Sequence, residues 1–388
     1  MAAKFHRLYS ERGMILFISV VILSLLLMVG LGSRVMLQND YRALSNLRGA
    51  TEAFYLSTAG LEWGKNEVFR ETTFPPTPAN RSESFAHGSF LVTFLSPIVS
   101  GPLSAKIVVR STGINGSSSH IVEARLTKTY DLADGAIGLR GNASEVNLSG
   151  GAVSISGRDH DWVTGKPLPN AKPRAALSAG DDSLRELIEQ AAANLPQGSI
   201  ENGTNAPVTA TGEYLPTTTV SQLAASLCGQ ATTILSTVPV SGQLIYENQN
   251  WGTRAIPELR CIDGLSESDD GVTLAGNMTG AGILIVRNAD LILTGSFRWD
   301  GLVIVTGADV SLKVIGSGVK EVVGAAVVNE TGSSPGKAIM NLEGNIRIVY
   351  SRQALEHTGQ LIPASILNNT YNYLPILIKQ DYWRSVTP

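Results

Sequence analysis

The sequence predicts an α+β protein in which one long N-terminal helix precedes a mainly β region. Three observations support this prediction. Residues 14–33 carry no charged side chain, no proline occurs before Pro75, and short β-branched runs separated by Gly and Asn fill much of the remaining chain. Within the β region we expect a small antiparallel sheet, followed by a right-handed parallel β-helix, or solenoid, with a partly helical insert.

The composition excludes several classes of protein. The 388 residues allow two or three domains. A hydrophobic content of 43% argues against disorder, and a net charge of −3 without long basic blocks argues against nucleic acid as a partner. Only 16% of residues are charged and 39 are glycine, which is typical of a β-rich protein outside the cytoplasm.

The uncharged run of residues 14–33 predicts a membrane helix. At about 1.5 Å rise per residue, it is long enough to cross a hydrocarbon core of about 30 Å. Lys4, Arg7 and Arg12 precede the run, so we expect the N-terminus in the cytoplasm and the bulk of the chain outside. Gly13 at the junction indicates cleavage before the helix, which is then retained. A removed signal peptide or a buried core helix are the alternatives.

A second helical segment follows the membrane run. Apolar residues recur every seven positions and form one stripe, at Leu47, Phe54, Leu61 and Val68. This stripe needs a partner, either the chain's own sheet or a neighbouring helix. Gly60 weakens the helix but permits close approach of another element. We expect the helix to end near Arg70, because prolines 75, 76 and 78 cannot continue it.

Two segments carry a family resemblance. Arg12-Gly13-Met14-Ile15-Leu16 with the following apolar run, and the segment from Leu47 to Glu62 (LRGATEAFYLSTAGLE), resemble the PilX N-terminal family of type IV pilus assembly proteins. The resemblance covers about the first 70 residues. It implies that a prepilin peptidase cuts between Gly13 and Met14 and that Met14 becomes N-methylated.

The chain departs from the common pilin pattern at two positions. Ile18 occupies the fifth position of the mature helix, where major pilins carry a glutamate used in subunit assembly. In this respect the chain resembles PilX-type minor pilins and the tip pseudopilin of type II secretion. Thr58 also replaces a glutamate of the family's AEAGLE box. The resemblance therefore implies an initiating, capping or accessory subunit.

The predicted domain boundaries follow changes in composition and in the pattern of apolar residues along the chain. We expect a leader at 1–13, the membrane and periplasmic helix at 14–72, and a small pilin-like sheet at 73–130. Strands are predicted at 90–95, 106–112 and 120–126, in a sheet that covers the stripe of Leu47, Phe54 and Leu61. A solenoid at 131–350 with an insert at about 158–260, and a packing tail at 351–388, complete the chain.

An internal repeat predicts the solenoid. GILIV beginning at Gly282 matches GLVIV at Gly301, 19 residues later, and GAAVV at Gly324 follows after 23 more. The strings DLILT at Asp290 and DVSLK at Asp309 also lie 19 apart. Coils of about 20 residues favour a parallel β-helix, with an antiparallel meander as the alternative. The apolar strings at 136–156 are expected to supply its early coils.

The insert and the tail are less regular. Helices are predicted at 182–195, capped near Asp181 and Asp182 and stopped by Pro196, and at 218–235. The insert is expected to cap one end of the solenoid. Cys228 and Cys261 form either a disulfide, which an outward compartment permits, or two buried thiols. Tyr371, Tyr373, Tyr382 and Trp383 in the tail are expected to pack on the solenoid's end or flank; a carbohydrate or partner surface is the alternative.

No catalytic motif stands out. The densest polar group is Arg158-Asp159-His160-Asp161-Trp162, which we interpret as a solvated turn after a strand. No metal or cofactor motif is recognised, because the two cysteines have no paired CxxC spacing or nearby histidine.

These features predict a non-enzymatic minor pilin of the PilX type, a single-pass protein of the bacterial inner membrane with a periplasmic or extracellular C-terminal domain. Its expected partners are the membrane, the prepilin peptidase and other pilins, and its outer domain would serve priming, tip formation or adhesion. The alternatives are a membrane-anchored β-helix scaffold and a carbohydrate-binding or carbohydrate-active protein.

Overall fold

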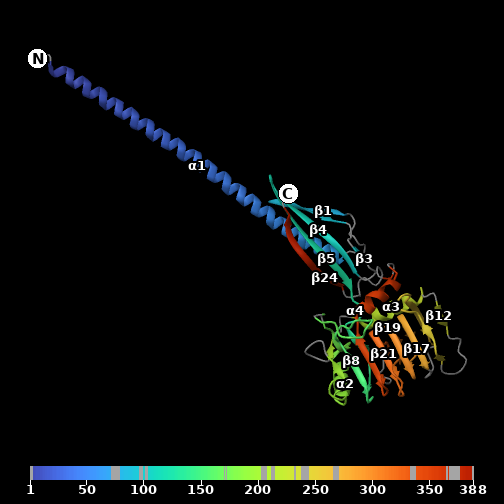
Figure 1. Ribbon diagram of the computed structural model, residues 1–388. Helices are drawn as coiled ribbons and strands as arrows, with labels where there is room; N and C mark the ends of the chain where they lie inside the picture. Colours follow the sequence, from blue (N-terminus) through green and yellow to red (C-terminus); the bar gives the residue numbers. More distant parts are fainter. Residues whose placement is uncertain are drawn as a thin grey trace.

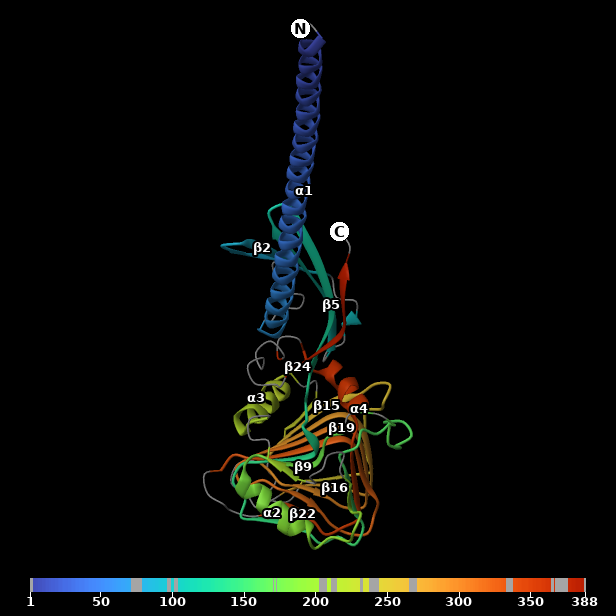
Figure 2. The ribbon, with the colours of Figure 1, turned by 90° about the vertical axis from the view of Figure 1, so that its left-hand side faces the viewer.

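The computed structural model describes residues 3–70, 79–95, 99–100, 104–169, 171, 173–201, 208–210, 215–230, 233–236, 244–264, 271–332, 338–363, 366 and 376–386. A long helix projects from a β-rich body that has two parts, an antiparallel sheet beside the helix and a larger region of parallel strands beyond it (Figure 1). Figure 2 shows the same arrangement from the side.

Helix α1 runs without interruption over Ala3–Arg70. The absence of proline allows this length, and the helix ends where the sequence predicts. It begins before Met14, so the peptide bond between Gly13 and Met14 lies within the helix. The segment of α1 beyond residue 48 lies against the antiparallel sheet.

The antiparallel sheet has the order β1-β2-β4-β5-β24, with β3 paired to β4. The strands are β1 (Asn80–Phe85), β2 (Gly88–Phe94), β3 (Val99–Ser100), β4 (Ser104–Asn115), β5 (Ser118–Tyr130) and β24 (Ile376–Val386). The three strands predicted from sequence are present as β2, β4 and β5. Their inward residues share one apolar core with Leu61 and Val68 of α1.

The C-terminal strand of this sheet was not predicted. β24 pairs antiparallel with β5 along its length, with an irregularity between Gln380 and Tyr382. The expectation that Tyr382 and Trp383 pack on the solenoid's end or flank is therefore wrong, because the open edge of β5 offers backbone hydrogen bonds to this strand. Tyr371 and Tyr373 lie outside the described residues.

The larger region contains two parallel sheets that share one apolar core. The first sheet comprises β6 (Gly135–Arg140), β8 (Val153–Ser156), β9 (Ala175–Ala179), β10 (Ile200–Glu201), β11 (Val208–Ala210), β12 (Thr233–Ser236), β14 (Asn250–Trp251), β15 (Glu258–Asp263), β17 (Asn277–Arg287), β19 (Ser296–Gly307), β21 (Lys320–Glu330) and β23 (Ile346–Tyr350). The second comprises β7 (Glu145–Leu148), β13 (Leu244–Glu247), β16 (Val272–Ala275), β18 (Leu291–Leu293), β20 (Leu312–Val314) and β22 (Ala338–Leu342). Between residues 272 and 350 successive strands alternate between the two sheets.

The glycine-led repeats pair in register. Gly282 lies opposite Gly301, which lies opposite Gly324, in parallel strands. All three have positive φ, and a Cβ on Gly301 would lie 2.1 Å from the carbonyl oxygen of Gly282. Only glycine permits this backbone and this approach. The second string of the repeat is offset by two residues from the prediction, because Leu291 pairs with Leu312.

The apolar strings at 136–156 were expected to supply the early coils ahead of the repeats, and this expectation is wrong. β6, β7 and β8 pair with β21, β22 and β23, so the early strands stack on the last repeats. The predicted insert also contributes strands to the first parallel sheet, since β9 pairs with β6 and β15 pairs with β17. Pairing between strands far apart in sequence cannot be read from a local repeat.

Among the elements whose bounds lie in the described residues are three shorter helices and one 3-10 turn: α2 (Asp182–Ala192), α3 (Thr217–Cys228), α4 (Arg352–Thr358) and η1 (Gly359–Leu361). Asp181 caps α2 by accepting from the Leu184 amide, as the polar residues at this boundary predict. The prediction that the second helix extends to residue 235 is wrong. Gly229 follows its last residue, and β12 occupies 233–236. Helix α4 packs against β19 and β21.

Candidate functional site

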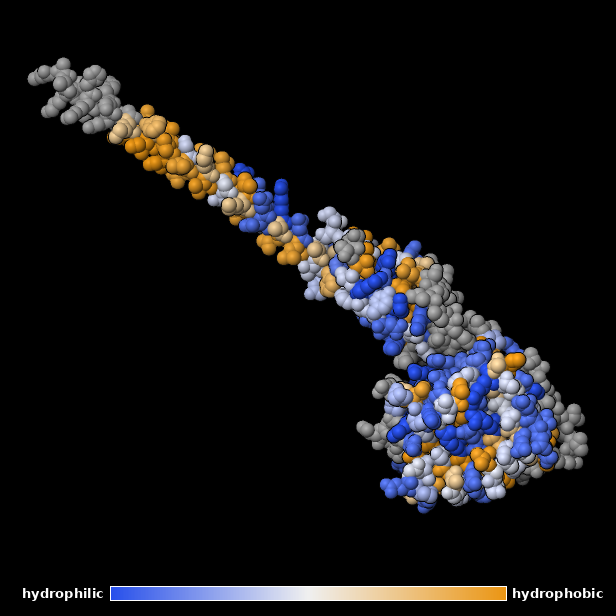
Figure 3. Space-filling model, viewed as in Figure 1, coloured by the Kyte–Doolittle hydropathy of each residue, from blue (hydrophilic) through white to orange (hydrophobic). Residues whose placement is uncertain are grey.

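The first candidate site is the exposed part of α1. Every residue from 14 to 48 is exposed, and α1 is long and apolar enough to cross a membrane. Figure 3 shows the first stretch of this exposed helix as an apolar band, which is followed by mixed polar and apolar side chains before the body begins. Ile18 is 47% exposed. Such a surface is unfavourable in water and needs lipid or other apolar helices around it.

The predicted stripe on α1 is only partly covered. Leu61 and Val68 are buried and Phe54 is half-buried, but Leu47 is 65% exposed. The prediction that the sheet covers Leu47 is wrong. The β4–β5 hairpin is the sheet's last element along α1, and its Ser118 lies over Gly49, so Leu47 projects beyond the sheet.

Small residues bring α1 close to the sheet. A Cβ on Gly60 would lie 2.3 Å from Ser111 Oγ and 2.7 Å from the Phe90 ring. A Cβ on Gly64 would lie 2.8 Å from a methyl group of Val109. Glycine at these two positions therefore sets the distance between helix and sheet. The sequence indicated close approach at Gly60 but not its partner.

Polar contacts fix α1 along the same interface. The His120 ring bridges two elements, with its Nδ1 3.1 Å from Ser57 Oγ of α1 and its Nε2 3.0 Å from Ser385 Oγ of β24. Near the end of the helix, Lys128 Nζ donates to the Val68 carbonyl at 2.8 Å. The last strand of the chain and the anchoring helix thus meet at one side chain of β5.

A buried carboxylate organises the opposite face of the sheet. Glu123 accepts hydrogen bonds from Arg110 at 2.8 Å, Arg384 at 2.8 Å and Tyr382 at 3.0 Å. Burial alone would raise the pKa of Glu123. The hydrogen bonds from Arg110, Arg384 and Tyr382 together outweigh this effect, so its pKa is lowered and the carboxylate stays ionised.

The prediction that residues 158–162 form a solvated turn is wrong. Asp159 and His160 are buried. Asp159 Oδ1 accepts from the Arg352 amide at 2.9 Å, and the His160 carbonyl accepts from Ser351 Oγ at 2.7 Å, which ties the turn to the start of α4. Burial lowers the pKa of His160, which favours its neutral form. Asp161 Oδ1 accepts a hydrogen bond from the Thr164 backbone amide at 2.7 Å, and Arg158 is exposed.

Cys228 and Cys261 are joined by a disulfide in the structure. Their Cα atoms are 5.4 Å apart, and the bond links the end of α3 to β15. Both residues are buried, so the bond fixes the helix to the first parallel sheet from within the core.

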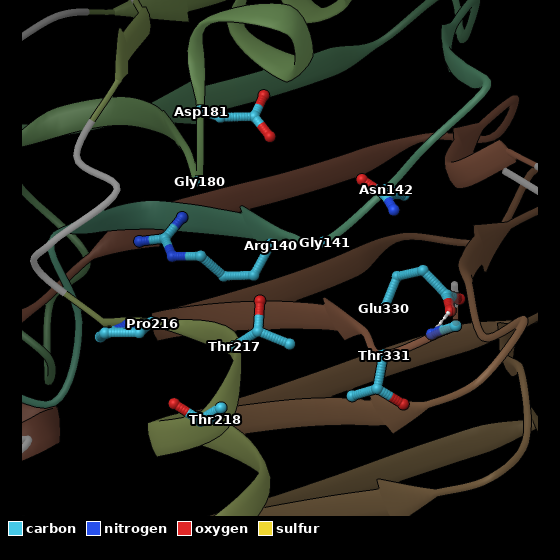
Figure 4. A pocket seen from close by; sticks show the side chains of 11 residues that line it. Arg140, Gly141, Asn142, Gly180, Asp181, Pro216, Thr217, Thr218, Glu330 and Thr331 are labelled. Carbon is cyan, nitrogen blue, oxygen red and sulfur yellow. Dashed lines mark hydrogen bonds between the residues drawn. The ribbon is translucent and has the colours of Figure 1, made fainter. Parts of the chain in front are cut away.

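A polar pocket of about 440 Å³ lies at the N-terminus of α3 (Figure 4). Arg140, Asp181, Thr217 and Glu330 are among its lining residues. The charged groups already have partners: Arg140 is paired with Asp134, and Glu330 accepts from the Val310 amide at 2.8 Å. Among the described residues none of the three threonine hydroxyls that line the pocket, those of Thr217, Thr218 and Thr331, is hydrogen-bonded to a carboxylate or imidazole.

Within the part of the chain that the structure describes, no group of three or more His, Cys, Asp or Glu side chains could hold a metal ion. Helix α1 begins at Ala3, so the predicted cleavage site between Gly13 and Met14 lies near its N-terminal end, far from the β-rich body (Figure 1).

Comparisons with known proteins add little. No protein-family model matches the chain, and no curated protein is significantly similar to it. Among solved structures, the competence-associated pilin ComZ from Thermus thermophilus aligns with 87% of this chain and 97% of its own chain. The identity is 12% and the TM-score is 0.29, which is too low to establish a shared fold.

Several residues of these sites were not found from the sequence. Lys128, His120 and Glu123 alternate with apolar residues in β5 and resemble ordinary exposed strand positions. Their partners lie on α1, β4 and β24, more than ten residues away in sequence. A polar residue on the inward face of a predicted strand, such as His120 in the strand predicted at 120–126, was the one available signal.

Proposed function

We propose that this chain is a non-enzymatic component of type IV pilus assembly, a minor pilin of the PilX type. One observation supports this proposal above the others. A single continuous helix has a fully exposed apolar half and a second half fixed to an antiparallel sheet by close glycine contacts. An anchor of this form holds a rigid outer domain at a set distance from the bilayer and leaves the apolar half free to pack among similar helices.

Under this proposal the chain is inserted once in the bacterial inner membrane. A prepilin peptidase cuts between Gly13 and Met14, and the new terminus at Met14 is methylated. Ile18 in place of a charged residue lowers the cost of residence in lipid. It also removes a charge that major subunits use, which favours a role in priming or at the tip.

The outer domain is proposed to be a right-handed parallel β-helix that serves tip formation or adhesion. The support is the in-register parallel pairing of the glycine-led repeats and the alternation of strands between two sheets. A stack of this kind extends by adding coils and offers a long rigid face.

A carbohydrate-binding or carbohydrate-active scaffold is the second candidate, and one observation favours it. On the outer face of the first parallel sheet, Glu321 bridges Arg298 and Arg347 on the neighbouring strands, at 2.5 Å to each. Beside this row the Trp162 ring lies 4.7 Å from His357. Rows of charged side chains next to an aromatic ring suit polar polymers, although these charges already neutralise each other. Retention of the protein on insoluble polysaccharide, lost in Trp162→Ala, would favour this candidate.

The mass of the mature N-terminus tests the leading proposal. We expect the native chain to begin at a methylated Met14. A Gly13→Leu chain is expected to keep its first 13 residues and to lose pilus function, because a bulky residue at the cleavage site blocks the peptidase. Gly32→Ala is the matched control, since a Cβ there meets nothing within 4 Å. A native chain that begins at Met1 or beyond Ser33 would overturn the proposal.

A further inference from the structure

The antiparallel sheet has a face directed away from α1. Residues that alternate outward along β4, β5 and β24 form this face, and no described helix packs on it. Its charged residues are five cations and two anions: Lys106, Arg110, Arg125, Lys379, Arg384, Glu123 and Asp381. The face thus carries an excess of positive charge in a chain whose net charge is −3. We call these residues the basic face.

Two cations of the basic face lack a counter-charge. The Arg125 guanidinium lies 4.8 Å from the centre of the Tyr382 ring and forms no ion pair among the described residues. Its Nε is buried and makes no hydrogen bond. Lys106 is exposed and, within the same described ranges, is likewise unpaired. An unpaired guanidinium beside an aromatic ring is a site at which an added carboxylate gains two strong hydrogen bonds.

The remaining arginines are held in position. Glu123 is buried and binds both Arg110 and Arg384, whose side chains are 42% and 62% exposed. One carboxylate thus orients two guanidinium groups, and each keeps further N–H donors directed to solvent. A preoriented donor loses less conformational entropy on binding than a free side chain.

The composition of the basic face favours a protein partner. Arginine and tyrosine are enriched at protein interfaces, whereas lysine is depleted. Exposed aliphatic side chains border the cations, namely Leu91 and Ile114, each 39% exposed. In Figure 3 apolar patches lie among the hydrophilic side chains over this sheet. A surface for phosphate polymers would be more densely and uniformly basic.

The position along α1 argues against the bilayer as the partner. Ser111, next to Arg110 on β4, contacts α1 at Gly60. Gly60 lies 27 residues beyond Ser33, the last residue of the uncharged run, which corresponds to about 40 Å along the helix. Lipid headgroups do not reach this height when the helix crosses the membrane upright.

We propose that the basic face binds a cluster of Asp and Glu side chains on another subunit of the same assembly, with Arg125 as the central contact. This inference rests on the proposed pilin function. It adds the chemistry of the partner surface and places that surface beside the sheet, at the level of the second half of α1.

The experiment uses the full-length chain in cells that produce it. A photo-crosslinking residue replaces Thr93, which lies beside Arg110 on the basic face, and Gln190 on α2 serves as the control position. We expect an adduct from Thr93 whose cross-linked partner peptide is acidic. A chain with both Lys106→Glu and Lys379→Glu leaves Glu123 and its partners intact. This double substitution should reduce the yield of the cross-linked adduct about tenfold. Arg125→Met, which keeps most of the aliphatic stem, should reduce it similarly.

A charge swap makes the test specific. Changing the partner's cross-linked carboxylates to lysine should restore the adduct with the Lys106→Glu, Lys379→Glu chain. An adduct that is insensitive to charge reversal, a partner peptide without acidic residues, or no protein adduct at Thr93 would each overturn the inference. So would binding of a labelled single-stranded oligodeoxythymidine that is lost in the reversed chain. The mass of the N-terminus, measured on the same material, decides separately whether the pilin proposal fails.

Discussion

The buried ammonium of Lys128 on β5 donates a hydrogen bond of 2.8 Å to the backbone carbonyl of Val68, two residues before α1 ends. The last four carbonyls of a helix have no partner within the helix. Lys128 is 1% exposed, so one of these carbonyls is satisfied by a charged donor inside the protein. This contact fixes the end of the long helix to the sheet that carries the rest of the molecule.

Replacing Lys128 by methionine should destabilise the sheet and helix together. The change keeps the aliphatic volume but leaves the Val68 carbonyl without this donor, at a cost of about 1–3 kcal/mol. Denaturant unfolding of the full-length protein in detergent, followed by the fluorescence of Trp63 in the same core, measures the change. Lys106→Met on the exposed face should stay within about 0.5 kcal/mol of the parent chain. Equal stability of the two variants would contradict this account.

Gly60→Ala should loosen the contact between α1 and the sheet. The new Cβ would lie 2.3 Å from Ser111 Oγ, so side chains or backbone must move, at a cost of about 1–3 kcal/mol. Alanine has a higher helix propensity than glycine, so the substitution would stabilise α1 if nothing lay close to residue 60. A Gly60→Ala chain that is more stable than the parent would therefore show that this contact is absent in solution. Thermal unfolding compared with Gly30→Ala, where the Cβ meets nothing, measures the effect.

Glu123 should make stability depend on pH in the acid range. Its pKa in the folded chain is below the ordinary value of 4.5, so its contribution is fully present above that value. The contribution is lost as the pH falls through the lower folded pKa. In Glu123→Gln the two arginines lose their counter-charge, so this chain should be less stable than the parent near pH 7. The difference should shrink as the pH falls below 4.5 and through the lower folded pKa, as followed by unfolding at each pH. A constant difference would exclude a role for ionisation.

Loss of the disulfide should destabilise the parallel sheets. The bond closes a loop with a sequence separation of 33 residues, for which loss of the cross-link costs about 3–4 kcal/mol by the chain-entropy account. A Cys228→Ser, Cys261→Ser chain should unfold at lower denaturant than the parent under oxidising conditions. The parent treated with reductant should match it. If reduction leaves the parent unchanged, the bond does not form in the protein as produced.

Local patterns predicted the local elements well. The uncharged run, the absence of proline and the heptad spacing gave the long helix and its end near Arg70, and alternation gave β2, β4 and β5. The glycine-led strings predicted which residues lie opposite each other in neighbouring parallel strands, because equivalent residues of a repeat pair at the same register. Asp181 at the start of α2 was recognised because capping depends only on adjacent residues.

Contacts between distant segments were predicted poorly. The second predicted helix was too long because apolar residues after Gly229 suit a strand as well as a helix. Asp159 and His160 read as a polar turn, yet they are buried because α4 from the tail covers them. The exposure of Leu47 depends on where the β4–β5 hairpin ends, which the helix sequence does not encode.

By itself the sequence determined the apolar half of α1, the proline stop and the order of the repeats, since each depends on residues close together in the chain. The tertiary structure alone decided that β24 closes the antiparallel sheet, that the strands of residues 135–156 stack on the last repeats, and that Glu123 gathers two arginines. Apart from the pairing of Arg110 with Glu123, these features require backbone edges and charges from segments far apart in the chain. Many alternative pairings satisfy the same local pattern, and only the packing of the whole chain selects among them.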